Sequence, residues 1–159
     1  MSAGDMVLFS GIIYTARDAA HRRFRDLIAA EKPLPFPIEG ATIYYAGPTP
    51  TPPHLPIGSC GPTTSGRMDP YTPALLSLGL RCMIGKGERS EAVCRAMETY
   101  QAVYLCAVGG AGALAARCIR KCEVIAFEDL GCESVKRLEV ENFPLLAAID
   151  CHGGNLFKR

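Results

Sequence analysis

The sequence predicts a single mixed α/β domain, spanning residues 1–159, with a parallel βαβ core and an additional layer of strands. Helical patterns and apolar strands alternate from residue 69 onward, which is typical of βαβ units on a parallel sheet. The first half is richer in strands and less regular, so an additional strand layer is expected beside the parallel core. Of the 159 residues, 48% are hydrophobic, which is enough for one sizeable core.

The first half is predicted to begin with a long strand and a helix. Residues 6–15 are rich in β-branched and aromatic side chains, and Gly11 marks a bulge or bend among them. Residues 17–30 carry apolar side chains at helical spacing. A short apolar strand is expected over residues 42–46. Five prolines between residues 48 and 56 then predict an ordered loop, because proline donates no ladder hydrogen bond.

The second half is predicted to alternate between helices and strands. Asp69 is expected to cap a helix over residues 70–78, with Pro70 in its first turn. The uncharged run over residues 99–116 is interpreted as a buried strand followed by a helix, because Gln101 and several glycines argue against a membrane span. The other expected elements are a strand over 80–85, a helix over 89–100, a strand over 102–108, a helix over 111–120, a strand over 123–127, a short helix over 133–138 and a last strand over 145–150.

Charge and cysteine content exclude several classes of protein. Lys and Arg number 17 against 16 Asp and Glu, and a net charge of +1 argues against binding nucleic acid or an anionic membrane through bulk electrostatics. Residues 1–5 lack a signal segment, which favours the cytoplasm. The eight cysteines include no CxxC pair, and the closest two are Cys118 and Cys122. We therefore expect mostly small, buried thiols in a reducing cytosol, with no metal held by this chain.

The densest polar segment covers residues 60–69 and reads CGPTTSGRMD. Two glycines, Gly61 and Gly66, permit unusual backbone angles and the close approach of a ligand. Three consecutive hydroxyl side chains offer donors and acceptors, and Arg67 offers a rigid fork for a carboxylate or phosphate. The helix expected next favours anions at its N-terminus. An ordinary capped loop would also explain these residues. The candidate ligand-binding residues of this segment are Gly61, Thr63, Thr64 and Arg67.

Two other places could bring charge to such a site. Arg17 and His21 are four residues apart and so share one face of the expected helix. An unperturbed histidine titrates near neutrality, although the arginines that follow make a solvated basic face an equally simple interpretation. Lys86 lies between two glycines directly after the strand over residues 80–85. That position is the edge at which open α/β sheets usually bind ligands.

A glycine-rich turn leaves a different function open. The run from Gly110 to Ala115 matches the G-x-G-x-x-A pattern of dinucleotide-binding turns, and Glu128 and Asp129 follow at about the expected distance. Close packing of a helix on a strand would explain the same small residues. A stand-alone nucleotide- or anion-binding module is therefore the alternative function.

Together and in this order, these segments resemble the β subunit of class I, iron–sulfur-dependent hydro-lyases, namely fumarate hydratase and L(+)-tartrate dehydratase. They are equally similar to the C-terminal domain of single-chain class I fumarases. The resemblance implies a swivelling β/β/α domain and a [4Fe–4S] cluster held by cysteines of a partner α subunit, in an α₂β₂ assembly. The matching segments, which cover nearly the full length, are residues 15–21, 45–48, 61–69, 84–87, 109–111, 128–131 and 150–156.

The resemblance further implies reversible hydration of the C=C bond of fumarate to L-malate, with L(+)-tartrate dehydration as the alternative. The SGRMD form of the central motif favours fumarate. Thr63 matches the family's threonine implicated in proton transfer, and His21 matches its candidate active-site histidine. A neutral threonine is a poor base, so it needs Arg67 close enough to stabilise its alkoxide. The positions implied to bind the dicarboxylate are Arg17, Arg67, Lys86, Gly61 and Thr64.

Overall fold

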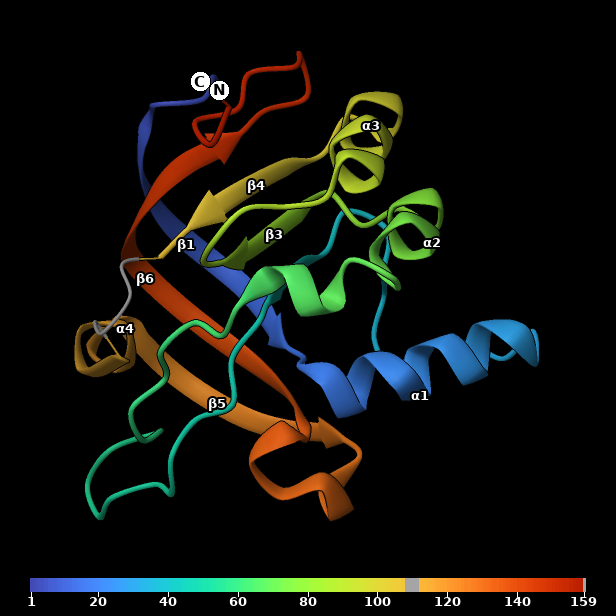
Figure 1. The fold of residues 1–159 in the computed structure, drawn as a ribbon. Helices are drawn as coiled ribbons and strands as arrows, with labels where there is room; N and C mark the ends of the chain where they lie inside the picture. Colours follow the sequence, from blue (N-terminus) through green and yellow to red (C-terminus); the bar gives the residue numbers. More distant parts are fainter. Residues whose placement is uncertain (108–111, 159) are drawn as a thin grey trace.

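The computed structural model of the chain describes residues 1–107 and 112–158 (Figure 1). Its strands form one six-stranded sheet in the order β1-β2-β3-β4-β6-β5. In chain order the elements are β1 (Met6–Thr15), α1 (Asp18–Ala29), β2 (Thr42–Tyr44), the 3₁₀ helix η1 (Ser65–Met68), α2 (Thr72–Ser77), β3 (Cys82–Gly85), α3 (Glu91–Tyr100), β4 (Val103–Cys106), α4 (Gly112–Cys118), β5 (Ile119–Ala126), the 3₁₀ segment η2 (Glu128–Glu133) and β6 (Val135–Ile149).

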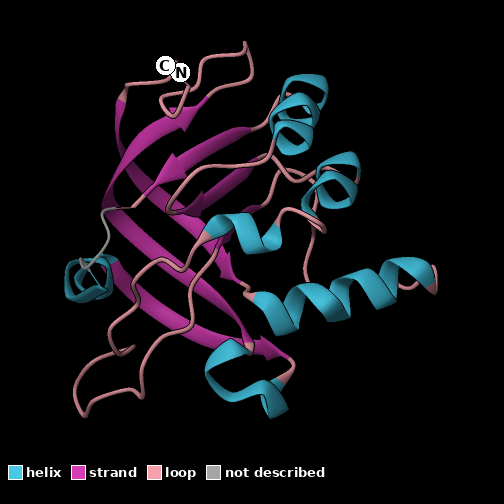
Figure 2. Cartoon of the chain, in the orientation of Figure 1, coloured by secondary structure: helices cyan, strands magenta, loops and turns pink. Residues whose placement is uncertain are grey.

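Strands β1 to β4 form a parallel core. Tyr44 of β2 lies opposite Thr15 of β1 and Ile84 of β3, and all of these strands run in the same direction as β4. Helices α1, α2 and α3 occur in the segments that join the four strands, and they lie on the same side of the sheet (Figure 2). The predicted parallel βαβ core is therefore confirmed.

Strand β6 closes the sheet into a small barrel-like ring. It runs antiparallel to β1 on one side and to β5 and then β4 on the other. Because β1 and β4 are the two ends of the parallel core, this double pairing joins them through β6, and β5 is attached outside the ring. Gly11 has a φ of 143° and follows a shift in register after Phe9, which confirms the expected bulge. The additional strands thus extend the same sheet and do not form a separate one.

The expected short helix over residues 133–138 is wrong, because these residues lead into and form the start of β6. The strand predicted to begin at residue 145 is the end of this much longer strand. Lys136 explains the error. It is buried in the strand, where its ammonium group donates hydrogen bonds to backbone carbonyl oxygens between residues 131 and 134. A buried lysine interrupts the alternation of polar and apolar residues by which a strand is recognised.

Two helix boundaries also differ from the prediction. Helix α2 begins at Thr72, its N-cap residue is Tyr71, and no side chain caps it. Asp69 instead directs its carboxylate at Arg89, a partner that lies 20 residues away in the sequence. Further on, α4 ends at Cys118 and β5 begins at once, so the strand starts earlier than predicted.

The apolar core has two layers, one on each face of the parallel strands. Phe24, Leu76 and Met97 belong to the layer between the sheet and helices α1 to α3. Tyr44 and Leu105 belong to the other layer, which fills the inside of the ring and extends beneath α4. Successive strand residues point to opposite faces, so each parallel strand contributes to both layers. The two layers together fix the strand ends at which the candidate site lies.

The cysteines and the uncharged run agree with their sequence interpretation. All eight cysteines are free thiols, four of them buried and only Cys132 exposed. The run over residues 99–116 contains β4 and then the start of α4, although residues 108–111 lie outside the described part of the chain. None of the described helices has the length and apolar character that crossing a membrane requires.

Asp150 ties the two ends of the chain together, and its removal should weaken the fold. Its carboxylate accepts hydrogen bonds of 2.8 Å from the backbone N–H groups of Ala3, His152 and Gly154. These bonds, that from Ala3 foremost, hold the pKa of Asp150 below its usual 3.8. We expect Asp150→Asn to lower the free energy of unfolding at neutral pH by about 1–3 kcal/mol, because an amide cannot accept all three bonds.

The effect should depend on pH in a defined direction. A carboxyl whose pKa is lowered by folding stabilises the protein above its unfolded pKa, and the contribution is lost as the pH falls through the folded pKa. Urea unfolding of both proteins should therefore show a difference at pH 7 that shrinks below the normal value of 3.8. Asp5→Asn is the matched control, since exposed Asp5 accepts one backbone bond from Ser2. Equal losses for the two variants would contradict the prediction.

Candidate functional site

The candidate residues gather where the parallel strands end. Arg17 follows β1, Gly47 follows β2 and Lys86 follows β3. The segment over residues 61–69 is attached to the same edge by two isolated β-bridges, between Ala46 and Pro62 and between Thr64 and Lys86. Parallel strands present their carboxyl ends at one edge, so residues that lie far apart in the sequence meet there. The structure thus brings the three charged or hydroxyl-rich motifs into one place.

Arg67 and Thr63 are in direct contact. The Arg67 guanidinium Nη2 donates a 2.6 Å hydrogen bond to Thr63 Oγ1, and the same nitrogen lies 3.2 Å from a carboxylate oxygen of Asp18. The backbone N–H of Thr63 donates to the Tyr45 carbonyl oxygen at 2.7 Å, which fixes the threonine to the end of β2. Half of the Arg67 side chain remains exposed (49%), so a ligand can reach it. The contact between Arg67 and Thr63 is the one that the proton-transfer role requires.

Arg17 is held against the backbone that follows β2. It is the N-cap residue of α1, with an extended backbone. A Cβ atom at Gly47 would lie 2.9 Å from Arg17 Cδ and 3.0 Å from its Nη1, so only glycine leaves room for the arginine. Among the residues that the structure describes, the buried Arg17 Nε has no hydrogen-bond partner. Arg17 therefore has an unsatisfied donor at the same edge as Arg67.

His21 lies one helical turn beyond Arg17 and is fully buried. Its Nδ1 is 2.8 Å from the Arg17 carbonyl oxygen, so Nδ1 carries the proton and donates it there. The rings of Phe24, Tyr45 and Tyr71 surround the imidazole. This burial lowers the pKa of His21 from 6.5 to about 4. The side chain is neutral at pH 7, and its buried Nε2 has no partner in the described residues.

Lys86 has a fixed backbone and an exposed side chain. Its carbonyl oxygen accepts from the Ser65 backbone N–H at 3.0 Å, and its own N–H donates to Ser65 Oγ at 3.1 Å. Any Cβ at Gly85 would collide with the Ser65 hydroxyl, and Gly87 adopts a positive φ of 82°. Both glycines that flank the lysine are thus needed for this turn. Within the described chain, the Lys86 ammonium group forms no ion pair.

The glycines of the 61–69 segment behave differently from the expectation. Neither Gly61 nor Gly66 has a positive φ, so the segment needs no unusual backbone angle. Gly61 instead packs beside Gly112 at the start of α4, where a Cβ on Gly112 would lie 3.1 Å from the Gly61 nitrogen. Thr64 is exposed, and its side chain does not cap η1. Gly61 and Thr64 therefore lie at the site edge without a bond that assigns them a role.

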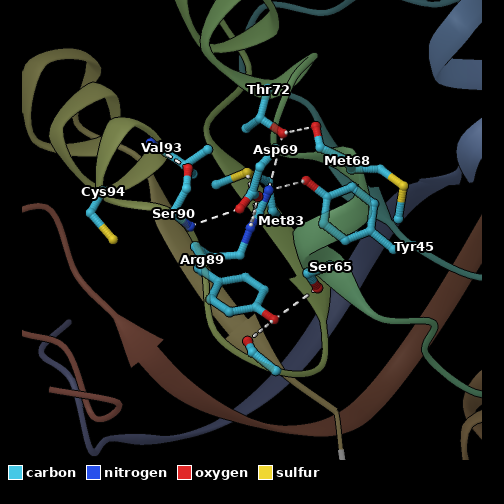
Figure 3. A network of polar contacts seen from close by, with 12 residues as sticks. Tyr45, Ser65, Met68, Asp69, Thr72, Met83, Arg89, Ser90, Val93 and Cys94 are labelled. Carbon is cyan, nitrogen blue, oxygen red and sulfur yellow. Dashed lines mark hydrogen bonds and ion pairs between the residues drawn. The ribbon is translucent and has the colours of Figure 1, made fainter.

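The sequence interpretation missed the buried network behind the site, which Figure 3 shows. Arg89 pairs with Asp69 and contacts Tyr45 and Thr72, and Tyr104 contacts Ser65. In the sequence, Arg89 is only the first residue of an expected helix and Asp69 only a helix cap. The partners come from the end of β2, from η1 and the start of α2, and from β4, and no local pattern connects them. Only the three-dimensional arrangement reveals them.

The dinucleotide interpretation does not fit the topology. Gly110 and Ala111 lie outside the described residues. The strand that follows α4 is β5, which pairs with β6 and not with β4. The acidic residues after β5 are therefore not at the end of a neighbouring parallel strand, as the nucleotide fingerprint requires. Asp129 forms a surface ion pair with Arg23.

The described residues also offer no metal site. In residues 1–107 and 112–158, no three His, Cys, Asp or Glu side chains gather around one point. The most buried thiols are poor ligands as they stand, since burial raises the pKa of Cys60 and of Cys82 to about 12.

Comparison with known proteins places this chain in a family. The chain is 45% identical over 152 residues to fumarate hydratase 1, mitochondrial, of Leishmania major, and 42% identical over 152 residues to fumarate hydratase class I, anaerobic, of Escherichia coli K12. Each match covers 94% of this chain but 28% of the relative, so the chain spans less than a third of those proteins.

A third relative has a similar length to this chain. It is the putative L(+)-tartrate dehydratase subunit beta of Methanocaldococcus jannaschii, 36% identical over 164 residues that cover 99% of this chain and 84% of the relative. The family described as Fumarase C-terminus matches residues 1–159, the whole chain. The resemblance stated from the sequence motifs is thereby confirmed, and the chain belongs to the fumarase C-terminus family.

Proposed function

We propose that this chain forms the C-terminal domain, or a separate β subunit, of a class I hydro-lyase that hydrates fumarate to L-malate. The observation that carries the proposal is the 2.6 Å contact between the Arg67 guanidinium and Thr63 Oγ1, at the strand edge that also bears Arg17 and Lys86. The names of the Leishmania and Escherichia coli relatives support it.

The positive charges at this edge suit a substrate with two carboxylates. Three cationic side chains, those of Arg17, Arg67 and Lys86, lie there, and within the described residues only Arg67 is paired with a carboxylate, that of Asp18. Each charge-assisted hydrogen bond to a carboxylate contributes about 1.5–3 kcal/mol. We assign Arg17 and Lys86 to the substrate carboxylates, because in the described part of the chain the buried Arg17 Nε has no hydrogen-bond partner and the exposed Lys86 ammonium group forms no ion pair.

Thr63 has the geometry for moving a proton. Its oxygen accepts from Arg67, so the hydroxyl proton remains available to a ligand. Hydration of fumarate requires a proton to be delivered to carbon beside a carboxylate, and dehydration requires the same proton to be removed. Delivering the hydroxyl proton would leave an alkoxide on Thr63. The guanidinium, already in contact, would stabilise that negative charge without reorganising. We therefore assign proton transfer to Thr63, with Arg67 as its electrostatic partner.

His21 enters the proposal through Arg17. The imidazole is buried and neutral, and it donates to the Arg17 carbonyl oxygen. This bond holds the turn in which β1 becomes α1, and the Arg17 side chain starts from that turn. We propose that His21 orients Arg17 as a neutral group and does not change its protonation state during the reaction.

Class I hydro-lyases imply an iron–sulfur cluster, and the described residues of this chain do not fit one. No three potential ligands gather, and the buried thiols are protonated. We propose that a [4Fe–4S] cluster, which would act as a Lewis acid on the substrate, is held by a partner α subunit or an N-terminal domain. The M. jannaschii relative, named a subunit beta, supports a partner subunit, and the resemblance suggests an α₂β₂ assembly.

L(+)-tartrate dehydration is the second candidate function. This chain matches the M. jannaschii relative over most of both lengths, and the name of that relative is that of a tartrate dehydratase subunit. Tartrate is also a four-carbon dicarboxylate, so the same cations would bind it. Co-expression with an α subunit, followed by cluster reconstitution and assays on fumarate, L-malate and L(+)-tartrate, distinguishes the two.

In that assembled enzyme, Arg67→Lys should lower kcat/KM for L-malate about 10²-fold. Lysine keeps the charge but cannot contact Thr63 and a carboxylate at once with a planar fork. Arg95→Lys is the matched control, because Arg95 also pairs with a carboxylate, that of Glu91, but on the exposed face of α3. A wild-type assembly without activity on any of the three substrates would refute the proposed function. A loss below threefold for Arg67→Lys would refute the role of the guanidinium.

Two substitutions of Thr63 separate chemistry from packing. Thr63→Ser keeps the hydroxyl group that Arg67 contacts, and we expect it to retain much of kcat. Thr63→Val keeps the shape and should lower kcat at least about 10²-fold, the lower end for general acid–base catalysis. KM should change little, since Arg17 and Lys86 still bind the carboxylates. The measurement is kcat of each assembled variant, corrected for cluster content. A Thr63→Val enzyme with nearly normal kcat would remove Thr63 from the mechanism.

The pH dependence tests the neutral role of His21. Its pKa is near 6.5 in the unfolded chain and about 4 when folded, so the unfolded state binds more protons between these values. We expect the free energy of unfolding to fall as the pH is lowered from 6.5 toward 4, and His21→Asn to reduce that slope. His54→Gln, at an exposed histidine, is the control. An NMR titration of the His21 ring with a midpoint near 6.5 would contradict the prediction.

A further inference from the structure

Arg89 is a charged residue whose side chain is fully buried. Its side chain has no exposed surface, and each of its three nitrogens has a partner. Nε donates to Asp69 Oδ1 at 2.7 Å, Nη1 to the Met83 sulfur at 3.4 Å, and Nη2 to Tyr45 Oη at 3.2 Å and Thr72 Oγ1 at 3.0 Å. The rings of Tyr45 and Tyr104 lie on the guanidinium at 5.1 and 4.9 Å. Its orientation is therefore fixed from every side (Figure 3).

The first partner, Asp69, connects Arg89 to the segment that carries Thr63 and Arg67. Asp69 directly follows η1, two residues after Arg67. Its second carboxylate oxygen accepts from the Ser90 backbone N–H at 2.7 Å. One carboxylate thus joins the end of η1 to the turn before α3, which follows Lys86. The distance between these two segments is set by a buried ion pair.

The two tyrosines that contact Arg89, Tyr45 and Tyr104, also contact residues of the candidate site and its supporting backbone. Tyr45 holds Arg89 with its hydroxyl group, while its backbone carbonyl oxygen accepts from Thr63 at 2.7 Å. The Tyr104 hydroxyl is hydrogen-bonded at 2.8 Å to Ser65 Oγ and at 2.8 Å to the Gly87 carbonyl oxygen. Ser65 in turn holds the backbone of Lys86 on both its N–H and carbonyl sides. Thr63 is therefore two contacts away from Arg89, through Tyr45, and Lys86 is three contacts away, through Tyr104 and Ser65.

We infer that Arg89 is a positioning residue of the substrate site, which sets Arg67 and Thr63 in register with Lys86 through Asp69, Tyr45 and Tyr104. The inference rests on the proposed function. Arg89 has no exposed surface and cannot touch a substrate. A displacement of about 1 Å at a reacting centre can cost about 10²-fold in rate, so a rigid frame behind two loops has a large effect on activity.

If Arg89 only stabilised the fold, a variant that keeps the stability of the protein would also keep its activity. Replacing a buried ion pair by apolar residues of similar volume is often neutral for stability, whereas removing one partner alone is strongly destabilising. The double substitution Arg89→Met/Asp69→Leu should therefore leave the melting temperature near that of the wild type. If Arg89 positions the site, kcat/KM for L-malate should still fall about 10²-fold, with KM raised and kcat lowered together.

Combining these substitutions with one at Arg67 tests whether Arg89 affects activity through Arg67. Residues that act through one another show non-additive losses, and independent sites add. We expect the double substitution to lower kcat/KM only slightly further when Arg67→Lys is already present. In an Arg95→Lys background it should lower kcat/KM by its full amount. Tyr104→Phe, which keeps the ring on Arg89 and removes the bonds to Ser65 and Gly87, should lower kcat/KM roughly tenfold by the loss of those bonds.

The experiment uses the cluster-loaded assembly and measures melting temperature, kcat and KM for L-malate in every variant. A stable double variant with a loss below threefold, or with a loss that adds fully to that of Arg67→Lys, would overturn the inference. If the double variant does not assemble, Tyr104→Phe decides, and a loss below threefold there overturns it as well. An inactive wild-type assembly refutes the proposed function instead, so the two failures are distinguishable.

Discussion

The pairing of β6 with both β1 and β4 is the constraint on which the rest of the fold depends. The four parallel strands alone would leave β1 and β4 as open edges with unpaired backbone groups. By pairing with both, β6 curves the core into a ring, encloses the second apolar layer and sets the strand ends in an arc. Arg17 and Lys86, which follow β1 and β3, are thereby brought to the segment that carries Thr63 and Arg67. The candidate site lies at the carboxyl ends of the parallel strands that this closure holds together.

A cluster of like charges needs a frame that does not depend on the charges themselves. Arg17, Arg67 and Lys86 repel one another, and Asp18 relieves only the repulsion on Arg67. The backbone at each position is instead held by groups behind the surface: His21 for Arg17, Tyr45 for Thr63 and Ser65 for Lys86. These are short hydrogen bonds between uncharged groups, so salt screens them little and they do not depend on the charges at the surface.

Periodic patterns in the sequence were enough to predict the parallel core, because the alternation of short apolar strands with helices can be recognised locally. The position of Lys86 directly after a strand also pointed correctly to the carboxyl-terminal edge of the sheet, whereas the attachment of residues 61–69 to that edge became visible only in the structure. Three features could not be predicted for a common reason. The length of β6, the partner of Asp69 and the burial of His21 all depend on contacts between residues far apart in the chain. Local propensity predicted that Asp69 caps a helix and that residues 133–138 form one. In the structure, Asp69 instead pairs with Arg89, and residues 133–138 lead into the paired strand β6.

The unsatisfied donors suggest what completes this edge. A buried N–H group without a partner lowers the stability of a folded protein by about 1–3 kcal/mol. In the described chain the Arg17 Nε is such a group, and a hydrogen bond to a carboxylate would satisfy it. Binding a dianion would also relieve the repulsion among the three cations, which strengthens the interaction beyond the sum of separate bonds. A second anionic group on this chain would give the same relief but would occupy the place of the substrate. An incomplete cationic edge on a rigid frame is therefore what a domain requires if the rest of its site comes from a partner.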